Sequence, residues 1–355
     1  MQGGSAYGVK YQARCISTVA ADTQQTVFLV GTLSLREQNE VHLIKYSAST
    51  GDVACEGLYS HAHEIWDLAN CPFDPLIFST VYASAGDFGA SVWRIPEHSK
   101  RTNQLEKLAD LSGHTKRIKC IDWSPNGREH SKLLSIDEEA LYVWDLDVNG
   151  SSVQVDKRIA PGVLYHMTKG AWDPHDLEII ATVSDSCVQF WDLRSSKQAH
   201  SLESAHAHDL DFDPQREHFF ATAGDASQIH IWDKRKLGRS LLELPGHSHW
   251  TWRVQYNPKC SDILLSSGTD SLVNLWTIAS IHEDTDGGRS PEDSPKAHAD
   301  PLLRSYNGHE DSVYGIAWSL KEPWIFASLS YDGRVLVDSV PQHIVKQIKA
   351  GTHGG

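Results

Sequence analysis

The chain has 355 residues, of which 40% are hydrophobic and 22% charged, and its formal net charge is −14. This composition is typical of a globular protein and excludes a largely disordered chain, although the count of 12 tryptophans is high. Because binding to a phosphate backbone requires clustered lysine and arginine, the acidic balance argues against nucleic acid as a direct ligand.

The cysteines and the N-terminus predict an intracellular protein. No CxxC pair occurs, which suits neither a zinc site nor a small disulfide scaffold. The N-terminus lacks the apolar run of a signal peptide, and no window approaches the length of a membrane span. We therefore expect a soluble protein of the cytoplasm and nucleus that has reduced thiols and does not insert into membranes.

The first predicted strands lie at residues 26–32, "TVFLVGT", and 40–47, "EVHLIKYS". Later strands end in tryptophan and recur 51, 47, 41 and 44 residues apart, close to the about 40–45 residues of one propeller blade. Counting one unit before that of Trp93, five tryptophan units and one that ends near Val340, we expect seven blades. The five tryptophans are Trp93, Trp144, Trp191, Trp232 and Trp276.

In most units a histidine precedes another strand, and the apolar residues of that strand lie at constant distances from the histidine. From His247 the residues at +5, +7 and +9 are Trp252, Val254 and Tyr256. Because successive strand residues point to opposite faces, we expect these positions to share a face, and Trp252 and the equivalent Trp66 to point into the blade packing. An aspartate six positions before the strand-end residue closes the preceding turn.

This pattern resembles the WD-repeat family over nearly the whole chain. The resemblance implies an all-β, seven-bladed WD-repeat β-propeller in which a His, a strand hydroxyl, an Asp and a Trp form a buried hydrogen-bonded tetrad. Four units depart from it. The first carries no tetrad, the unit of Trp191 has no His in phase, the unit of Trp232 has Ala226 in place of the Asp, and the last has Asp338 in place of the Trp. The residues predicted to form the structural repeat are His61, His114, His247, His309, Asp87, Asp185, Asp270 and Asp332.

The sixth unit contains an insertion. Residues 282–301, "HEDTDGGRSPEDSPKAHADP", are acidic and lack an apolar period, which predicts a disordered loop within blade six. Residues 1–355 would form a single propeller with blades at roughly 9–349. The strand that closes the ring could come from the N-terminal "YGVKY" or from the C-terminal "IVKQIKA".

Two adjacent units place an arginine three residues after the tryptophan. "SDSCVQFWDLR" and "GDASQIHIWDKR" resemble the DWD box, whose bearers dock onto the damage-specific DNA-binding adaptor of cullin-4 RING ubiquitin ligases. Basic residues after "WD" are also common in other propellers, so a purely structural role stays open. The residues that the resemblance implies for adaptor docking are Trp191, Asp192, Arg194, Trp232, Asp233 and Arg235.

The repeated polar residues argue against an enzyme. His, Ser and Asp recur once per blade, whereas an active site needs one constellation, and no metal-ligand spacing or phosphate-binding loop occurs. We therefore expect no catalytic residue, no metal and no cofactor. Arg117, Trp250 and Tyr331 fall in the loops beside the repeat histidines, where a few aromatic or arginine anchors would bind a partner, although each could equally be structural.

Longer stretches resemble the WD-repeat family that interacts with the EARP and GARP vesicle-tethering complexes, over residues 1 to about 340. They include "YGVKYQARC", "GTLSLREQNEVHL" and "GHSHWTWRVQYNP". The opening "MQGGS" and the DWD boxes are similar to the plant branch named for abscisic-acid hypersensitivity.

This resemblance implies two alternative functions for a non-catalytic scaffold. One is a substrate receptor that joins the cullin-4 adaptor to a target protein, in plants a regulator of abscisic-acid signalling. The other is an accessory factor that binds EARP or GARP subunits in endosome recycling and retrograde transport, located peripherally at endosomes or the trans-Golgi network.

Overall fold

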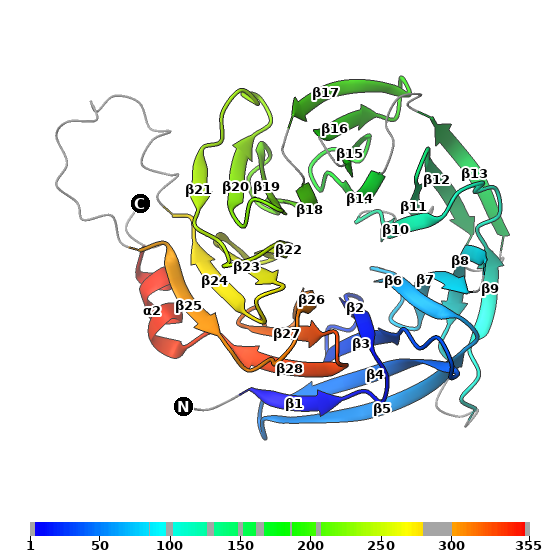
Figure 1. Cartoon of the computed structure of the whole chain (residues 1–355), viewed down its shortest axis with the longest axis horizontal. Coiled ribbons are helices and arrows are strands. Elements are labelled where there is room, and N and C mark those ends of the chain that lie inside the picture. The colour runs from blue at the N-terminus through cyan, green and yellow to red at the C-terminus, as the bar shows by residue number, and fades with distance from the viewer. Residues whose placement is uncertain are drawn as a thin grey trace.

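The computed structural model describes residues 4–84, 86–96, 102–125, 131–147, 152–160, 167–184, 187–203, 207–279 and 300–351. Within these ranges the strands form seven four-stranded antiparallel sheets, arranged as blades around a ring (Figure 1). The predicted seven-bladed β-propeller is therefore confirmed. Each sheet runs from an inner strand beside the central channel to an outer strand at the circumference.

The blades follow the chain order, and their strands are given from the inside outwards. Blade 1 contains β2 (Ala13–Thr18), β3 (Thr26–Thr32), β4 (Asn39–Ser47) and β5 (Asp52–His61). Blade 2 contains β6 (Glu64–Asn70), β7 (Ile77–Ser84), β8 (Asp87–Arg94) and β9 (Glu106–Asp110). Blade 3 contains β10 (Ile118–Trp123), β11 (Ser131–Asp137), β12 (Leu141–Asp147) and β13 (Ser152–Ile159). Blade 4 contains β14 (Met167–Trp172), β15 (Ile179–Ser184), β16 (Cys187–Asp192) and β17 (Lys197–Glu203).

The remaining blades complete the ring. Blade 5 contains β18 (Ala207–Phe212), β19 (Phe219–Gly224), β20 (Ile229–Asp233) and β21 (Leu242–Leu244). Blade 6 contains β22 (Thr251–Asn257), β23 (Cys260–Gly268), β24 (Val273–Thr277) and β25 (Leu302–Tyr306). Blade 7 contains β26 (Val313–Trp318), β27 (Ile325–Ser330), β28 (Arg334–Ser339) and β1 (Ser5–Gly8). Most of the predicted disordered loop at 282–301 lies outside the described residues, between β24 and β25.

The hydrophobic core lies between the blades. Each of the seven clusters of buried side chains in the described ranges draws on two neighbouring sheets. Between blades 2 and 3, for example, Val81 and Val92 pack with Trp123 and Trp144. No sheet can bury both of its apolar faces alone, so the ring is stable only when every blade has two neighbours.

The N-terminus closes the ring. β1 pairs with β28 in the register Ser5↔Val337 to Gly8↔Arg334, so the first strand of the chain covers the outer edge of the last blade. The alternative closing segment, "IVKQIKA", belongs instead to helix α2 (Gln342–Gly351), whose Ile344 and Val345 pack in one cluster with Trp318 of blade 7 (Figure 1). Among the described residues, no helix is long and apolar enough to span a membrane.

Candidate protein-interaction sites

Blades 3 and 6 contain the complete hydrogen-bonded tetrad. In blade 6, His247 Nδ1 lies 2.8 Å from Asp270 Oδ1, and its Nε2 lies 2.8 Å from Ser266 Oγ. The indole of Trp276 donates to the same hydroxyl at 2.8 Å. Although burial favours the neutral acid, hydrogen bonding to His247 lowers the pKa of Asp270 below its ordinary value. These polar groups satisfy one another and hold the blade together.

Blade 3 repeats the arrangement with an aspartate that the sequence spacing missed. His114 contacts Asp137 Oδ2 at 2.8 Å and Ser135 Oγ at 2.6 Å, and Trp144 donates to Ser135 at 2.8 Å. Asp137 lies seven positions before Trp144 rather than six, because the turn is one residue longer. A search that allowed one extra turn residue would have found it.

Blades 2 and 7 contain partial tetrads. His61 Nε2 lies 3.3 Å from Thr80 Oγ1, but its Nδ1 faces the backbone oxygen of His63 at 2.8 Å. His309 Nε2 bonds Ser328 Oγ at 2.8 Å, while its buried Nδ1 has no partner among the described residues. Asp332 is exposed and accepts the amide of Arg334 instead. The Asp87 side chain and the whole of Asp185 lie outside the described residues.

The DWD-box residues separate into buried and exposed sets. Trp191 and Trp232 are buried and donate to Thr182 and Thr222, at 2.8 and 2.9 Å. The arginine side chains are 68% exposed at Arg194 and 54% at Arg235, so these two can reach a partner. They follow β16 and β20, equivalent strands of adjacent blades, and therefore lie on the same rim, opposite the His loops.

The two arginines are held differently. Asp233 accepts from Arg235 Nε at 2.9 Å and from Nη2 at 2.7 Å, which fixes the guanidinium plane. Arg194 has only longer contacts, 3.6 Å to Asp192 Oδ1 and 3.8 Å to Asp176 Oδ2. Beside Arg235, a cavity of about 440 Å³ lies between blades 4 and 5, and its lining includes the apolar Ile179, Phe190 and Leu237.

A second surface lies at the channel mouth on the His-loop face, and β-bulges create it. Each inner strand has a bulge at the same position near its start, where one residue has no partner on the next strand. All of these bulged residues are half-buried, whereas the residue before each is buried. We call them the bulge ring: Arg14, Trp66, Lys119, Thr168, His208, Trp252 and Tyr314.

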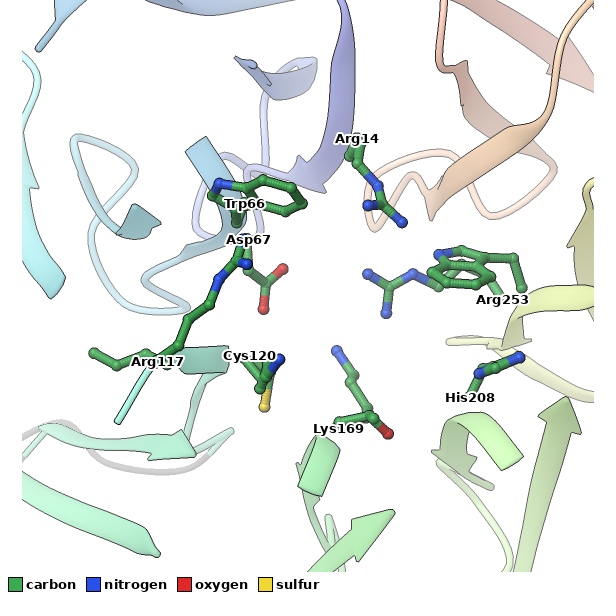
Figure 2. Close-up of a pocket in the computed structure, with 12 residues that line it drawn as sticks. Arg14, Trp66, Asp67, Arg117, Cys120, Lys169, His208 and Arg253 are labelled. Atoms are coloured by element: carbon green, nitrogen blue, oxygen red, sulfur yellow. The ribbon is translucent and has the colours of Figure 1, made fainter. Parts of the chain in front are cut away.

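Trp66 and Trp252 therefore line the channel mouth. Trp66 also packs against the core between blades 2 and 3, as predicted, but the prediction missed that both residues face the cavity. A cavity of about 280 Å³ is lined by both tryptophans, by Arg14 and Arg117, and by charged residues of the next layer such as Lys169. Figure 2 shows Arg14, Trp66, Arg117 and Lys169 converging from several blades on one space. A bulge inserts one residue into the alternation, so the period of two fails at this position.

The three residues predicted for this face lie around the same mouth. Arg117 lines the cavity and lies 4.3 Å above the Trp66 ring. Trp250 is 44% exposed and contacts the cavity residue His208, with ring centroids 6.0 Å apart. Tyr331 packs edge-on against Tyr314 at 5.7 Å. The fold thus brings together anchors from three blades that the sequence related only by repeat position.

The described residues contain no group of three or more His, Cys, Asp or Glu side chains placed to hold a metal ion. The described surfaces of interest are thus the arginine rim and the channel mouth. Such surfaces suit protein recognition, because guanidinium groups and aromatic rings give strong, directional contacts at interfaces.

The comparisons with known proteins agree with this architecture. Residues 1–276 match the model of the EIPR1 β-propeller family, and residues 300–337 match the WD domain, G-beta repeat. The chain belongs to the EIPR1 β-propeller family. WD-repeat propellers of this kind are typically non-catalytic scaffolds.

Relatives in plants and animals cover almost the whole chain. The WD repeat-containing protein DWA2 of Arabidopsis thaliana is 50% identical over 345 residues, 96% of this chain and 98% of the relative. The human EARP and GARP complex-interacting protein 1 is 32% identical, over 95% of this chain and 96% of the relative. The EARP-interacting protein 1 of Caenorhabditis elegans is 29% identical, over 94% of this chain and 95% of the relative.

Proposed function

We propose that this propeller is a substrate receptor that docks on the cullin-4 RING ligase adaptor through the arginine rim and presents a target protein on its His-loop face. The main supporting observation is the pair of exposed arginines, Arg194 and Arg235, at equivalent strand ends of adjacent blades. The similarity of the two motifs to the DWD box supports the choice of partner. In a plant the target would be a regulator of abscisic-acid signalling, and the receptor would act in the cytoplasm and nucleus.

The geometry suits recognition of carboxylates on the adaptor. Asp233 holds two nitrogens of Arg235 and leaves its remaining Nη1 group available. The neighbouring apolar cavity between blades 4 and 5 could take a hydrophobic side chain from the same partner. Trp191 and Trp232 would act by fixing the strand ends from which the arginines project.

The test is co-purification of the tagged full chain with the cullin-4 adaptor. We expect the double variant R194A/R235A to recover much less adaptor, because both exposed guanidinium groups are lost. Arg334→Ala is the matched control, since Arg334 is also exposed, at 40%, but lies at the start of β28 on the opposite rim. Unchanged recovery with R194A/R235A would remove the proposal.

A second candidate function is that of an accessory factor that binds EARP or GARP tethering subunits and supports endosome recycling and retrograde transport. The observation in its favour is the similarity to the human protein named for interaction with those complexes, over 95% of this chain. Such a protein would associate peripherally with endosomes or the trans-Golgi network. A pulldown without tether subunits, together with wholly nuclear fluorescence, would contradict this function.

A further inference from the structure

The channel carries charge of both signs, but its acids and its cations have different roles. Asp67 Oδ2 accepts the backbone amide of Ile121 at 3.0 Å, and Asp209 Oδ2 accepts that of Val254 at 3.0 Å. Each of these bonds joins the inner strand of one blade to the inner strand of the following blade. The carboxylates therefore serve the fold, since they satisfy amides that the ladder leaves free.

The cations at the mouth differ in whether a carboxylate lies beside them. Arg253 lies 3.3 Å from Asp209, and Lys119 lies 2.9 Å from Glu138. By contrast, Arg14, Arg117 and Lys169 have no carboxylate within 4.0 Å among the residues that the structure describes. The cavity lining contains five cationic side chains and one carboxylate, in a chain whose net charge is −14. The mouth is thus a local exception to an acidic protein.

Two of these cations, Arg14 and Arg117, are held in place by aromatic rings. The Arg14 guanidinium lies 4.3 Å from the Tyr314 ring centroid, 5.2 Å from that of Trp252 and 5.6 Å from that of Trp66. Arg117 lies over the same Trp66 ring at 4.3 Å. Stacking orients a guanidinium without neutralising its charge, so these groups stay available for an anion.

The charges point into one space. Figure 2 shows the charged ends of Arg14, Lys169 and Arg253 directed toward one another across the cavity. Burial and the neighbouring Arg253 lower the pKa of Arg14, as expected where like charges meet. The pKa values of Lys169 and Arg253 are instead raised despite burial, because Asp67 and Asp209 lie nearby, so the repulsion falls on Arg14. The cavity of about 280 Å³ has room for a side chain but not for a folded element. An inserted anionic group would relieve this repulsion.

We propose that the channel mouth binds a peptide segment of a partner protein through an anionic side chain, a carboxylate or a phosphoryl group, that enters the cavity beside Arg14, Arg117 and Lys169. The flanking peptide lies on the exposed faces of Trp66 and Trp252. This inference deepens the target-binding part of the proposed function and rests on it only in taking the ligand to be a protein. It names the chemistry of the partner, which the proposed function leaves open.

The test uses a degenerate peptide library that contains aspartate, glutamate, phosphoserine and their neutral counterparts, captured on the immobilised full chain. We expect at least severalfold enrichment of an anionic residue at one position, and enrichment that falls in high salt because the contact is electrostatic. Preference for Asp and Glu would identify a carboxylate ligand, whereas preference for phosphoserine would identify a phosphoryl ligand.

Two variants and a matched control assign the binding to the mouth. Arg14→Gln and Arg117→Gln should each reduce the enrichment by about tenfold or more, which corresponds to about 1.4 kcal/mol. Lys116→Gln removes the same charge one residue away, from an exposed side chain that pairs with Glu139 at 3.4 Å, and should leave the enrichment unchanged. Melting curves establish that each variant is folded. Arg117 makes no hydrogen bond to the described fold, so its variant tests binding even where Arg14→Gln is unstable.

The inference is overturned if the wild-type chain shows no anionic preference at any position, or if both arginine variants retain it. Its failure is distinguishable from that of the proposed function. R194A/R235A should lose the adaptor and keep the peptide preference, whereas Arg117→Gln should do the reverse. Peptide enrichment without any adaptor binding would leave the mouth site standing and remove the ligase role.

Discussion

Blades 6 and 7 are neighbours with the same strand layout, but they stabilise their inner geometry differently. In blade 6, His247 bonds both Asp270 and Ser266, and Trp276 shares the hydroxyl. In blade 7, His309 bonds only Ser328, and Asp338 replaces the tryptophan. β1 gives blade 7 the same four strands as blade 6, but blade 7 is followed by helix α2, whose Ile344 and Val345 add to the core cluster. A blade can therefore lose half of its polar tetrad when additional apolar burial stabilises it.

The largest expected effect is the removal of the histidine in each blade. His247→Ala should lower the free energy of unfolding by about 3–5 kcal/mol, because it removes the bonds to both Asp270 and Ser266 and leaves a cavity at a buried position. His309→Ala should cost less, about 1–3 kcal/mol, since only one hydroxyl loses its bond. Denaturant unfolding measures both. His249→Ala, at an exposed residue of the same loop as His247, is the control and should change stability little. Equal losses at His247 and His309 would contradict the comparison.

The second-largest expected effect is a loss of stability in acid, which comes from the blades with partial tetrads. Burial lowers the pKa of His309 to about 4, and likewise that of His61. Each histidine takes up a proton near pH 6.5 in the unfolded chain but only near pH 4 in the folded chain. The folded state is therefore fully stable above pH 6.5 and loses stability as the pH falls from 6.5 toward 4. The maximum is about 3 kcal/mol per histidine. Melting temperatures at pH 7 and pH 5 should show this loss, and His309→Asn should reduce it. An unchanged slope in that variant would refute the assignment.

The turn aspartates give a smaller contrast. Asp270→Asn should destabilise the chain by about 1–3 kcal/mol, because the bond to His247 loses its charge. Asp332→Asn should cost less than about 0.5 kcal/mol, since Asp332 is exposed and bonds only a backbone amide. The two variants change the same atoms at equivalent turns, so each serves as the control for the other. A larger loss at Asp332 would mean that it acts through His309 after all.

The smallest effect should be a gain in stability. Burial raises the pKa of Asp338, so the ionised carboxylate is poorly solvated at neutral pH. Asp338→Asn should therefore stabilise blade 7 slightly, by less than about 1 kcal/mol, in thermal unfolding at pH 7. The gain should shrink in acid, where the wild-type carboxyl is itself neutral. A clear loss at pH 7 would show that the charge has a partner role.

Much of the fold followed from local patterns in the sequence. The spacing of the tryptophans and the phase of the histidine strands predicted seven blades, and both complete tetrads contain a histidine that the phase selected. Asp137 was missed because a turn can gain one residue without changing the strands it connects. The identity of the closing strand was left undecided between "YGVKY" and "IVKQIKA", although Ile344, Val345 and Ile348 of the second segment recur at helical spacing. The structure makes this segment a helix whose Ile344 and Val345 pack in one cluster with Trp318.

The candidate sites were less predictable. Arg194 and Arg235 were found because their positions depend on the repeat alone, and an arginine after a strand end is exposed by default. The bulge ring was not found, because a bulge depends on how neighbouring strands pair and not on the composition of one strand. Trp66 and Trp252 look like core residues in the alternating pattern, yet the extra residue turns one face of each toward the channel.

The sequence by itself determined the number of blades, the histidines and tryptophans of both complete tetrads and the rim where two arginines project, because these depend on short-range periodicity and repeat along the chain. Only the tertiary structure decided which terminus closes the ring and which side chains meet at the channel mouth. Both outcomes depend on contacts between residues far apart in the chain. The first depends on which segment pairs with the edge of β28, and the second on which side chains of different blades the bulges direct into one cavity.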